Sequence, residues 1–332
     1  RHPLAIVWES KITAKYGDGR CVGGGGAVVV ALNATDLRCL SLADGRPRWE
    51  RDGCRERESP VVLAGPFVWG RIERNDEDGS IRLSRIDLAT GSSSEHVSAV
   101  GLGAQGVGSH RGRQVIFARY GRIAVDGAFF EEAPPLFGRM QAGRCYTVPR
   151  PAANGSLDAG VACVEMEDDR EVWRVPSDDG KTEYVVSVSE ELLVSFSFGG
   201  ELRARSPKDG RLLWRSSTEN SWDTLAPVVI ASGHVFHWES RVLRALRVEN
   251  GEVAWTREVP GERTNVIATR GALWVGLEGA DGGHRLTALD PSTGATLWET
   301  RVAARLAGRA LHSIDDRLVC IVGRKLVCFA HG

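Results

Sequence analysis

A tryptophan-anchored segment that recurs along the chain limits the folds open to this sequence. The segments end at Trp49, Trp173, Trp214, Trp255 and Trp298, and the last four tryptophans stand 41, 41 and 43 residues apart. Each segment alternates apolar and polar residues, passes through a turn rich in Asp, Asn and Gly, and continues into a strand that ends in the tryptophan. A period of about 40 residues built from short strands is the sequence signature of four-stranded propeller blades. The repeat therefore predicts an all-β chain.

Two further positions of the repeat agree with this interpretation. A glycine, which tolerates the positive φ of a tight turn, stands four residues before the tryptophan in all copies but one: Gly45, Gly210, Gly251 and Gly294, with Asp169 as the exception. A small residue stands ten residues before the tryptophan in every copy: Cys39, Cys163, Ala204, Ala245 and Ala288. Because Cys alternates with Ala there, we interpret these cysteines as small packing residues where blades approach closely.

Weaker copies of the repeat and the two chain ends give the expected number of blades. Two degenerate copies lie around Gly91 and Gly127, with Glu95 and Phe129–Phe130 near the tryptophan position. The C-terminal stretch RLVCIVGRKLVCFAHG supplies apolar strands but no tryptophan strand, whereas the N-terminal stretch LAIVWES supplies one, centred on Trp8. We therefore predict an eight-bladed β-propeller of four-stranded antiparallel blades, closed by pairing the N- and C-terminal strands in one blade. Seven blades is the alternative if residues 98–144 are misinterpreted.

We expect residues 1–332 to form a single propeller domain. Since the chain opens with Arg1 and shows no signal-peptide core, we expect either a processed mature chain or a domain excised from a longer protein. It contains no apolar run of 18 or more residues, so no membrane-spanning helix is predicted. The 42 basic and 43 acidic residues give a net charge of -1, which favours neither nucleic acid nor an anionic membrane as a partner.

The cysteines give a hint about compartment. There are seven of them, an odd number, and no two form a C-x-x-C pair. This pattern argues against both a zinc site and a disulfide framework. Unpaired thiols favour a reducing, cytoplasmic location, with the periplasm as the alternative if a signal peptide was removed.

The form A-L-D-x-x-T-G-x-x-x-W, from Ala288 to Trp298, resembles the repeat of the pyrroloquinoline-quinone propeller family. The resemblance implies a propeller across the chain, in which the repeat tryptophans dock neighbouring blades: Trp8, Trp49, Trp173, Trp214, Trp255 and Trp298. The family includes quinone-dependent dehydrogenases, a lipoprotein scaffold of outer-membrane assembly, and sensor domains of signalling proteins. The sequence has neither the vicinal Cys-Cys pair of the quinoproteins nor a C-x-x-C-H haem motif. We therefore expect no catalytic site, no cofactor and no metal.

Loops on one face of the ring are the expected place for binding, because a rigid frame holds them. Three connections are longer than the others: residues 74–80, 149–159 and 278–284. Trp222 stands outside the repeat position, and it is interpreted either as an aromatic anchor for a partner or as a packing residue at the channel rim. The candidate partner-binding residues are Trp222, Asn75, Asp76, Arg150, Asn154 and Asp281.

Two motifs resemble metal sites but have simpler explanations. His234 and His237 stand three apart on an expected strand, so their side chains should point to opposite faces. We expect one packed and one exposed histidine rather than a shared metal. The acidic stretch at residues 75–79 lacks the full calcium-loop pattern and is interpreted as a solvated hairpin turn.

Taken together, the complete ring and the absence of a recognisable reaction centre favour a non-catalytic scaffold or sensor. It would bind a protein or peptide through loops on one face. One alternative is a small-ligand or quinone site in the channel, which would make the protein an oxidoreductase or a ligand sensor. Another is a structural spacer in a larger bacterial signalling or assembly protein, whose partners would be other domains of the same polypeptide.

Overall fold

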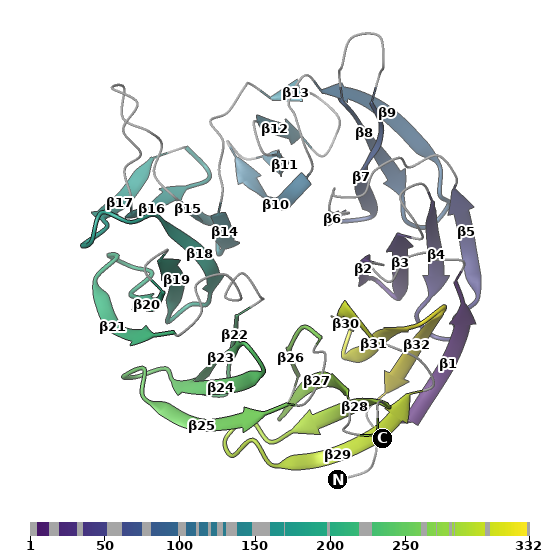
Figure 1. Ribbon diagram of the computed structural model, residues 1–332. Coiled ribbons are helices and arrows are strands. Elements are labelled where there is room, and N and C mark those ends of the chain that lie inside the picture. The colour runs from purple at the N-terminus through teal and green to yellow at the C-terminus, as the bar shows by residue number, and fades with distance from the viewer. Residues whose placement is uncertain are drawn as a thin grey trace.

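Four-stranded antiparallel sheets stand around a central opening (Figure 1). The computed structural model describes residues 5–12, 20–31, 36–51, 62–74, 81–98, 104–110, 113–118, 121–124, 129–130, 138–147, 160–168, 170–197, 200–218, 228–259, 264–269, 271–278, 281, 283–302 and 306–330. Within these residues there are eight sheets, and no helix is long and apolar enough to cross a membrane. The predicted all-β propeller with four-stranded antiparallel blades is confirmed.

Each sheet runs from an inner strand at the opening to an outer strand at the rim (Figure 1). The first four sheets, from inner to outer strand, are β2 (Arg20–Gly24), β3 (Ala27–Ala31), β4 (Leu37–Ser41) and β5 (Pro47–Arg51); β6 (Val62–Ala64), β7 (Phe67–Arg74), β8 (Ile81–Asp87) and β9 (Ser93–Ser98); β10 (Ala104–His110), β11 (Arg113–Ala118), β12 (Gly121–Ala124) and β13 (Phe129–Phe130); and β14 (Gly138–Gln141), β15 (Arg144–Thr147), β16 (Gly160–Glu165) and β17 (Glu171–Pro176).

The other four sheets follow in the same order around the ring. They are β18 (Glu183–Val188), β19 (Leu193–Ser197), β20 (Glu201–Arg205) and β21 (Leu212–Ser217); β22 (Val229–Ala231), β23 (His234–Glu239), β24 (Val242–Arg247) and β25 (Val253–Glu258); β26 (Ile267–Thr269), β27 (Ala272–Glu278), β28 (His284–Leu289) and β29 (Thr296–Val302); and β30 (Leu306–Ile314), β31 (Arg317–Val322), β32 (Lys325–Ala330) and β1 (Ala5–Lys11).

The last sheet joins the two ends of the chain, as the sequence predicted. β1 is its outer strand and pairs antiparallel with β32, from Ala5 opposite Ala330 to Lys11 opposite Lys325. An ion pair between Lys325 Nζ on β32 and Glu9 Oε2 on β1, 2.7 Å apart, also joins these two strands. The ring is thus closed by strand pairing between the two ends of the chain, within a single sheet.

Tryptophans on the outer strands reach the turn of the following sheet. The indole N–H of Trp8 donates to the Leu42 carbonyl at 2.8 Å. Four other indoles make the equivalent bond to the carbonyl three residues before the turn glycine of the next sheet: Trp49 to Leu88, Trp173 to Pro207, Trp214 to Val248 and Trp255 to Pro291. Trp298 is half-buried and packs edge-on against Trp274, with 5.9 Å between ring centroids.

The docking of an indole against the turn of the next sheet explains the glycine of the repeat more fully than turn geometry alone does. Gly251 has a φ of 73°, which glycine adopts without strain. A Cβ at this position would also lie 2.5 Å from the Trp214 ring, and Gly45 stands in the same relation to Trp8. The glycine is therefore required both by the backbone and by the indole that rests on it.

A β-bulge precedes each of these docking tryptophans. In the sheet of β29, Ala288 pairs with Trp298 and Leu289 pairs with Thr296, so Leu297 is an extra residue on the outer strand. The same shift occurs at the residue before the other five tryptophans: Val7, Arg48, Val172, Leu213 and Ala254. A bulge bends and twists the strand that contains it. It thereby turns each indole toward the neighbouring sheet.

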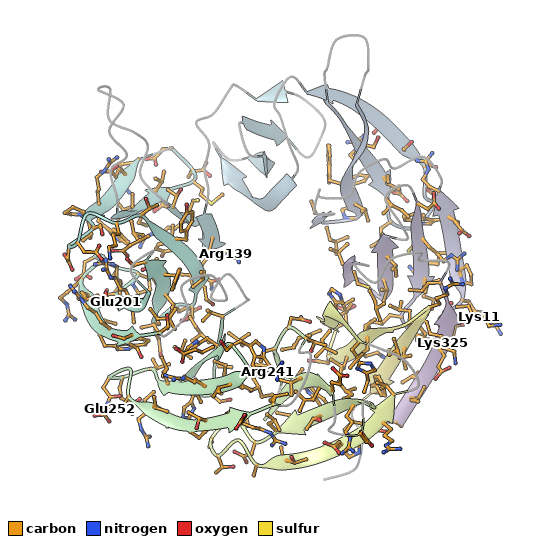
Figure 2. All side chains as sticks on the ribbon, viewed as in Figure 1. Lys11, Arg139, Glu201, Arg241, Glu252 and Lys325 are labelled. Carbon is orange, nitrogen blue, oxygen red and sulfur yellow. The ribbon has the colours of Figure 1, made fainter. Side chains whose placement is uncertain are left out.

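The core lies between adjacent sheets rather than inside any one of them. The small repeat residues are fully or almost fully buried there, each directly opposite a tryptophan: Cys39, Cys163, Ala204, Ala245 and Ala288. Charged side chains lie at the outer rim and near the central opening, as the labelled Glu252 and Arg241 illustrate (Figure 2). The packing interpretation of Cys39 and Cys163 agrees with this burial.

Candidate protein-interaction face

The strand ends that flank the connections marked for binding by the sequence all lie at one end of the sheets. Because neighbouring strands are antiparallel, the turns from second to third strand and the links from each outer strand to the next sheet lie at the same end. We call this end the loop face. Five of the predicted partner-binding residues lie outside the described part of the chain: Trp222, Asn75, Asp76, Arg150 and Asn154.

Asp281, the sixth of these predicted residues, lies on the loop face between β27 and β28. Its carboxylate contacts Arg301 and forms a 3.4 Å ion pair with Arg285. It also accepts the backbone N–H of Gly283 at 3.1 Å. Arg285 in turn pairs with Glu299 at 2.7 Å. The structure therefore shows Asp281 engaged with its own chain, and its role toward a partner stays a prediction.

The loop from Ser177 to Lys181, which connects β17 to β18, lies on the loop face and is held by several hydrogen bonds. Asp179 organises it: one carboxylate oxygen accepts Ser177 Oγ at 2.7 Å and the Lys181 backbone N–H at 3.1 Å. Gly180 completes the turn with a φ of 67°. Asp178 points outward and contacts Arg215 on β21. The loop is exposed, yet several bonds fix its shape.

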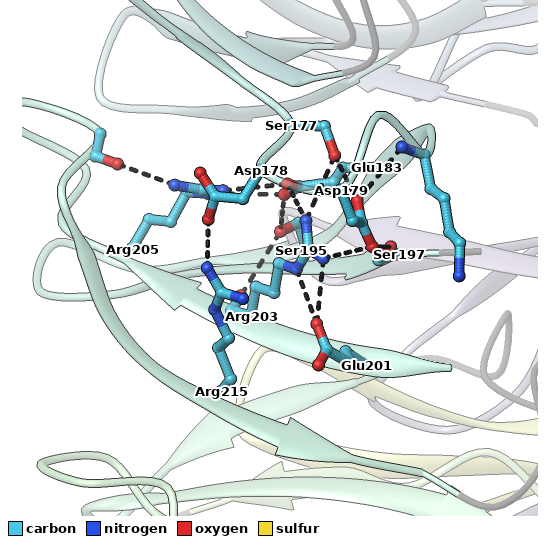
Figure 3. A network of polar contacts seen from close by, with 12 residues as sticks. Ser177, Asp178, Asp179, Glu183, Ser195, Ser197, Glu201, Arg203, Arg205 and Arg215 are labelled. Atoms are coloured by element: carbon cyan, nitrogen blue, oxygen red, sulfur yellow. Dashed lines mark hydrogen bonds and ion pairs between the residues drawn. The ribbon is translucent and has the colours of Figure 1, made fainter. Parts of the chain in front are cut away.

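A buried ionic network lies directly beneath this loop (Figure 3). Arg203 on β20, with a side chain only 1% exposed, donates to Asp179 at 2.7 Å and to Glu183 at 2.6 Å. It also donates to Glu201 at 3.0 Å. A guanidinium has five donors in a fixed fork, so Arg203 can hold the loop and two strands at once. The loop conformation is thus anchored from inside the sheet.

Glu183, at the start of β18, forms the centre of the network. Its carboxylate is fully buried and accepts bonds from both arginines, from Arg203 at 2.6 Å and from Arg205 at 2.9 Å. Ser195 Oγ donates to its second oxygen at 2.7 Å. Arg205 also donates to the carbonyl of Gly210, the turn glycine against which Trp173 packs. The network therefore runs from the loop face to the junction with the preceding sheet.

Charge pairing outweighs burial in this network. Burial raises the pKa of Glu183, but its bonds to Arg205, Ser195 and Arg203 together lower the pKa by more than burial raises it. The net pKa therefore lies below the ordinary value of a glutamate. The pKa of Asp179 is depressed in the same way by Ser177, Lys181 and Arg203. Both carboxylates are therefore ionised at neutral pH. The stability that they contribute is present at neutral pH and is lost as the pH falls through their depressed values.

Sequence reasoning missed this network, although one position signals it. In the equivalent register of four other sheets an aliphatic residue stands where Arg205 does: Leu40, Val164, Leu246 and Leu289. An arginine at an otherwise apolar repeat position requires a buried counter-charge. Glu183 supplies it from a strand 22 residues earlier in the chain.

A second polar cluster lies near the loop face in the next sheet. His237 on β23 is 2% exposed and stands directly opposite Arg244 on β24. Arg244 Nε pairs with Glu239 Oε2 at 2.5 Å. His234 is also buried, at 9%, and its Nδ1 lies 2.8 Å from the Ser232 carbonyl. The expectation that one of the two histidines is exposed is wrong, because Val235 packs toward the preceding sheet and Phe236 toward the following one, so both faces of β23 are covered.

Burial of His237 predicts that the folded protein loses stability in acid. The pKa of His237 is lowered to about 4. Desolvation is the largest cause, Glu239 partly opposes it, and Arg244 adds to the lowering. Because the unfolded chain binds the proton more readily, we expect unfolding free energy to fall as the pH drops from about 6.5 to about 4, by about 3 kcal/mol in total. Urea unfolding at a series of pH values measures this slope. Val275 and Val30 stand at the position equivalent to His237 in two other sheets, so a valine should fit there. H237V should therefore flatten the dependence of unfolding free energy on pH. An unchanged slope in H237V would contradict the assignment.

The described residues contain no set of three or more His, Cys, Asp or Glu side chains that could hold a metal ion. Burial raises the pKa of the Cys39 and Cys163 thiols to about 11. These two cysteines therefore stay protonated at neutral pH, as packing residues do. Cys54 lies outside the described residues.

Solved structures with the same fold differ in what they do. BamB from Moraxella catarrhalis superposes with a TM-score of 0.72 at 13% identity, covering 99% of this chain and 100% of that one. The quinohemoprotein alcohol dehydrogenase ADHIIG from Pseudomonas putida HK5 superposes with a TM-score of 0.67 at 13% identity, covering 98% and 76%. The computationally designed Ika8 protein gives 0.62 at 14%, covering 98% and 99%. At such identities these likenesses establish the fold alone.

Sequence comparison separates the family from the wider fold. No curated protein matches the chain by sequence. Residues 157–332, slightly more than half of the chain, match the family described as outer membrane protein assembly factor BamB. This stretch includes the strongest repeat copies and the ionic network beneath the loop face. The chain belongs to this family of pyrroloquinoline-quinone-like repeat propellers.

Proposed function

We propose that this protein is a non-catalytic scaffold that binds a protein or peptide partner through its loop face. The observation that carries the proposal is the loop from Ser177 to Lys181, which is exposed but held by Arg203 from beneath. A loop fixed before binding loses little conformational freedom when a partner docks, and affinity rises accordingly. The family description, an assembly factor, supports an interaction role.

The loop offers charged groups to a partner while its anchor stays intact. Asp178 and Lys181 are exposed, and neither takes part in the bonds between Arg203 and Glu183. Both can therefore be removed without breaking the buried network. A partner that docks here would meet a preformed pattern of charged side chains, the ion pair of Asp178 with Arg215 beside Lys181.

The test is recovery of a partner with tagged protein from its native host. We expect one protein to co-purify with the parent and to fall about tenfold in the double variant Asp178→Ala, Lys181→Ala. The matched control is Glu190→Ala, Glu191→Ala, in the exposed turn at the opposite end of β18, which should recover the partner normally. Equal recovery with both double variants would contradict the proposal. A small molecule that co-purifies and is released only on denaturation would favour the channel-ligand alternative.

A further inference from the structure

The turn that joins β24 to β25 contains a chemically labile pair of residues. Asn250 is exposed, and Gly251 follows it. An asparagine before a glycine loses its side-chain amide with particular ease, because no Cβ hinders the attack of the next backbone nitrogen on the side-chain carbonyl carbon. The turn joins a third strand to a fourth, so it lies at the end of the sheets away from the loop face. It therefore stands apart from the surface proposed to bind a partner.

The charge of a neighbouring residue explains why an amide rather than an acid stands in this turn. In the sheet of β2 to β5 the equivalent residue is Asp44, which accepts the Arg46 backbone N–H at 3.2 Å and pairs with the Arg46 side chain at 3.5 Å. Asn250 Oδ1 accepts the backbone N–H of Glu252 at 3.0 Å in the same way. An aspartate here would stand beside an acidic side chain instead of a basic one. Because the Trp214 ring requires a glycine next, the neutral amide and the glycine come together.

The folded turn restrains the backbone nitrogen that would attack. The Gly251 N–H donates to the Arg247 carbonyl at 2.9 Å, and the residue lies buried against the Trp214 ring. The indole N–H of Trp214 also donates to the Val248 carbonyl at 2.7 Å, which holds the turn against β21. The attacking nitrogen must first lose its proton, and a buried, hydrogen-bonded N–H does so only when the structure around it opens. Docking of Trp214 therefore suppresses the reaction.

We propose that Asn250 is a modification site, protected while Trp214 is docked and converted to aspartate or isoaspartate when this junction opens. The Gly251 nitrogen gives its proton to water and forms a bond to Asn250 Cγ. The bond from Cγ to Nδ2 breaks, and the side-chain nitrogen takes up a proton and leaves as ammonia. Water then opens the resulting cyclic imide at either of its two carbonyls, which gives the two products. Water is the co-reactant, and the turn itself supplies the other reacting groups.

Isoaspartate would disturb the junction that protected the residue. Its main chain runs through the side-chain carbons, so the backbone between residue 250 and Gly251 gains one atom. This position lies within the hairpin closed by the Arg247 N–H, which donates to the Glu252 carbonyl at 2.8 Å. Gly251 has no room to shift toward the indole, because even a Cβ there would lie 2.5 Å from the Trp214 ring. We therefore expect the converted turn to open more often, so that one opening leaves a permanent weakening of the junction.

The experiment compares the rate of conversion in the folded parent, in the synthetic peptide LRVENGEVAW and in two folded variants, all at one mildly alkaline pH. Mass spectrometry of proteolytic fragments measures the conversion at residue 250. We expect the folded parent to convert at least about tenfold more slowly than the peptide, since the rate follows the population of the opened turn. Trp214→Leu should raise the rate in the protein about tenfold. The matched control Trp49→Leu, which removes a docking indole at another junction, should convert as the parent does.

Asn250→Asp tests the effect on the junction, because it adds the charge of the product without lengthening the backbone. Asp209 occupies the equivalent turn of the preceding sheet, so an aspartate fits there. The isoaspartate fraction of aged parent, separated by chromatography, should melt at a lower temperature than Asn250→Asp.

Equal conversion rates in the folded parent and the peptide would overturn the proposal. So would equal rates in Trp214→Leu and Trp49→Leu. An isoaspartate fraction that melts together with Asn250→Asp would disprove the weakening of the junction. No partner enters these measurements, so this proposal and the proposed function fail independently.

Discussion

Replacement of Trp8 by Ala should destabilise the whole ring by about 3–5 kcal/mol, the usual cost of removing a large buried aromatic side chain. Trp8 is 7% exposed, its indole donates to Leu42, and its ring rests on Gly45. Through these contacts the N-terminal strand β1, which is paired with β32, packs against the first sheet. Chemical denaturation of the parent and of W8A measures the difference.

Ile6 is the matched control for this experiment because it lies on the same strand and is 56% exposed. Ile6→Ala should change the unfolding free energy by no more than about 0.5 kcal/mol. If W8A were as stable as Ile6→Ala, the docking role of Trp8 would be disproved. If both variants were strongly destabilised, the strand as a whole rather than the indole would account for closure.

Removal of the buried charge at Glu183 should have an effect of similar size. Glu183→Leu leaves Arg203 and Arg205 buried without their shared partner, which typically costs about 3–5 kcal/mol. Replacing Arg205 by Leu in the same molecule removes one unpaired charge and restores the residue type of the other sheets. The unfolding free energy of the double variant should therefore exceed that of Glu183→Leu alone by at least about 1 kcal/mol. Thermal unfolding of the parent, the single variants Glu183→Leu and Arg205→Leu, and the double variant gives these values.

The exposed Glu191, in the turn at the other end of β18, is the control for loss of a carboxylate. Glu191→Leu should leave stability within about 0.5 kcal/mol of the parent. Strictly additive effects of Glu183→Leu and Arg205→Leu would show that the two side chains do not depend on each other. That result would remove the network as the anchor of the loop above it.

The repeat was predictable from sequence because each of its features has a local physical reason. Gly251 is required by its turn, Ala245 by close packing, and Trp255 by the junction that it fills. These residues recur at fixed spacing, so one copy supports the interpretation of the next. Closure through β1 also followed, since the two ends supplied complementary strands.

The ionic network could not be predicted by the same reasoning. Glu183 and Arg203 meet because two strands of one sheet bring them together, and nothing in the spacing of the repeat specifies the pair. The burial of His234 likewise depends on a neighbouring sheet. Alternation along a strand assigns residues to faces, but it cannot tell whether a face is covered. The predicted binding residue Asp281 illustrates the limit for loops, because its arginine partners come from different strands.

The shared last sheet has a consequence for the order in which the chain can fold during synthesis. β1 leaves the ribosome before the other strands of the ring, but its partner β32 is made after all of them, so β1 must wait until nearly all of the propeller has been synthesised. Meanwhile the tryptophan junctions between consecutive sheets can form one after another. The final step then joins the last-made strands to the first-made sheet through Trp8. Bringing such distant segments together is slow, and we expect ring closure to limit the folding rate.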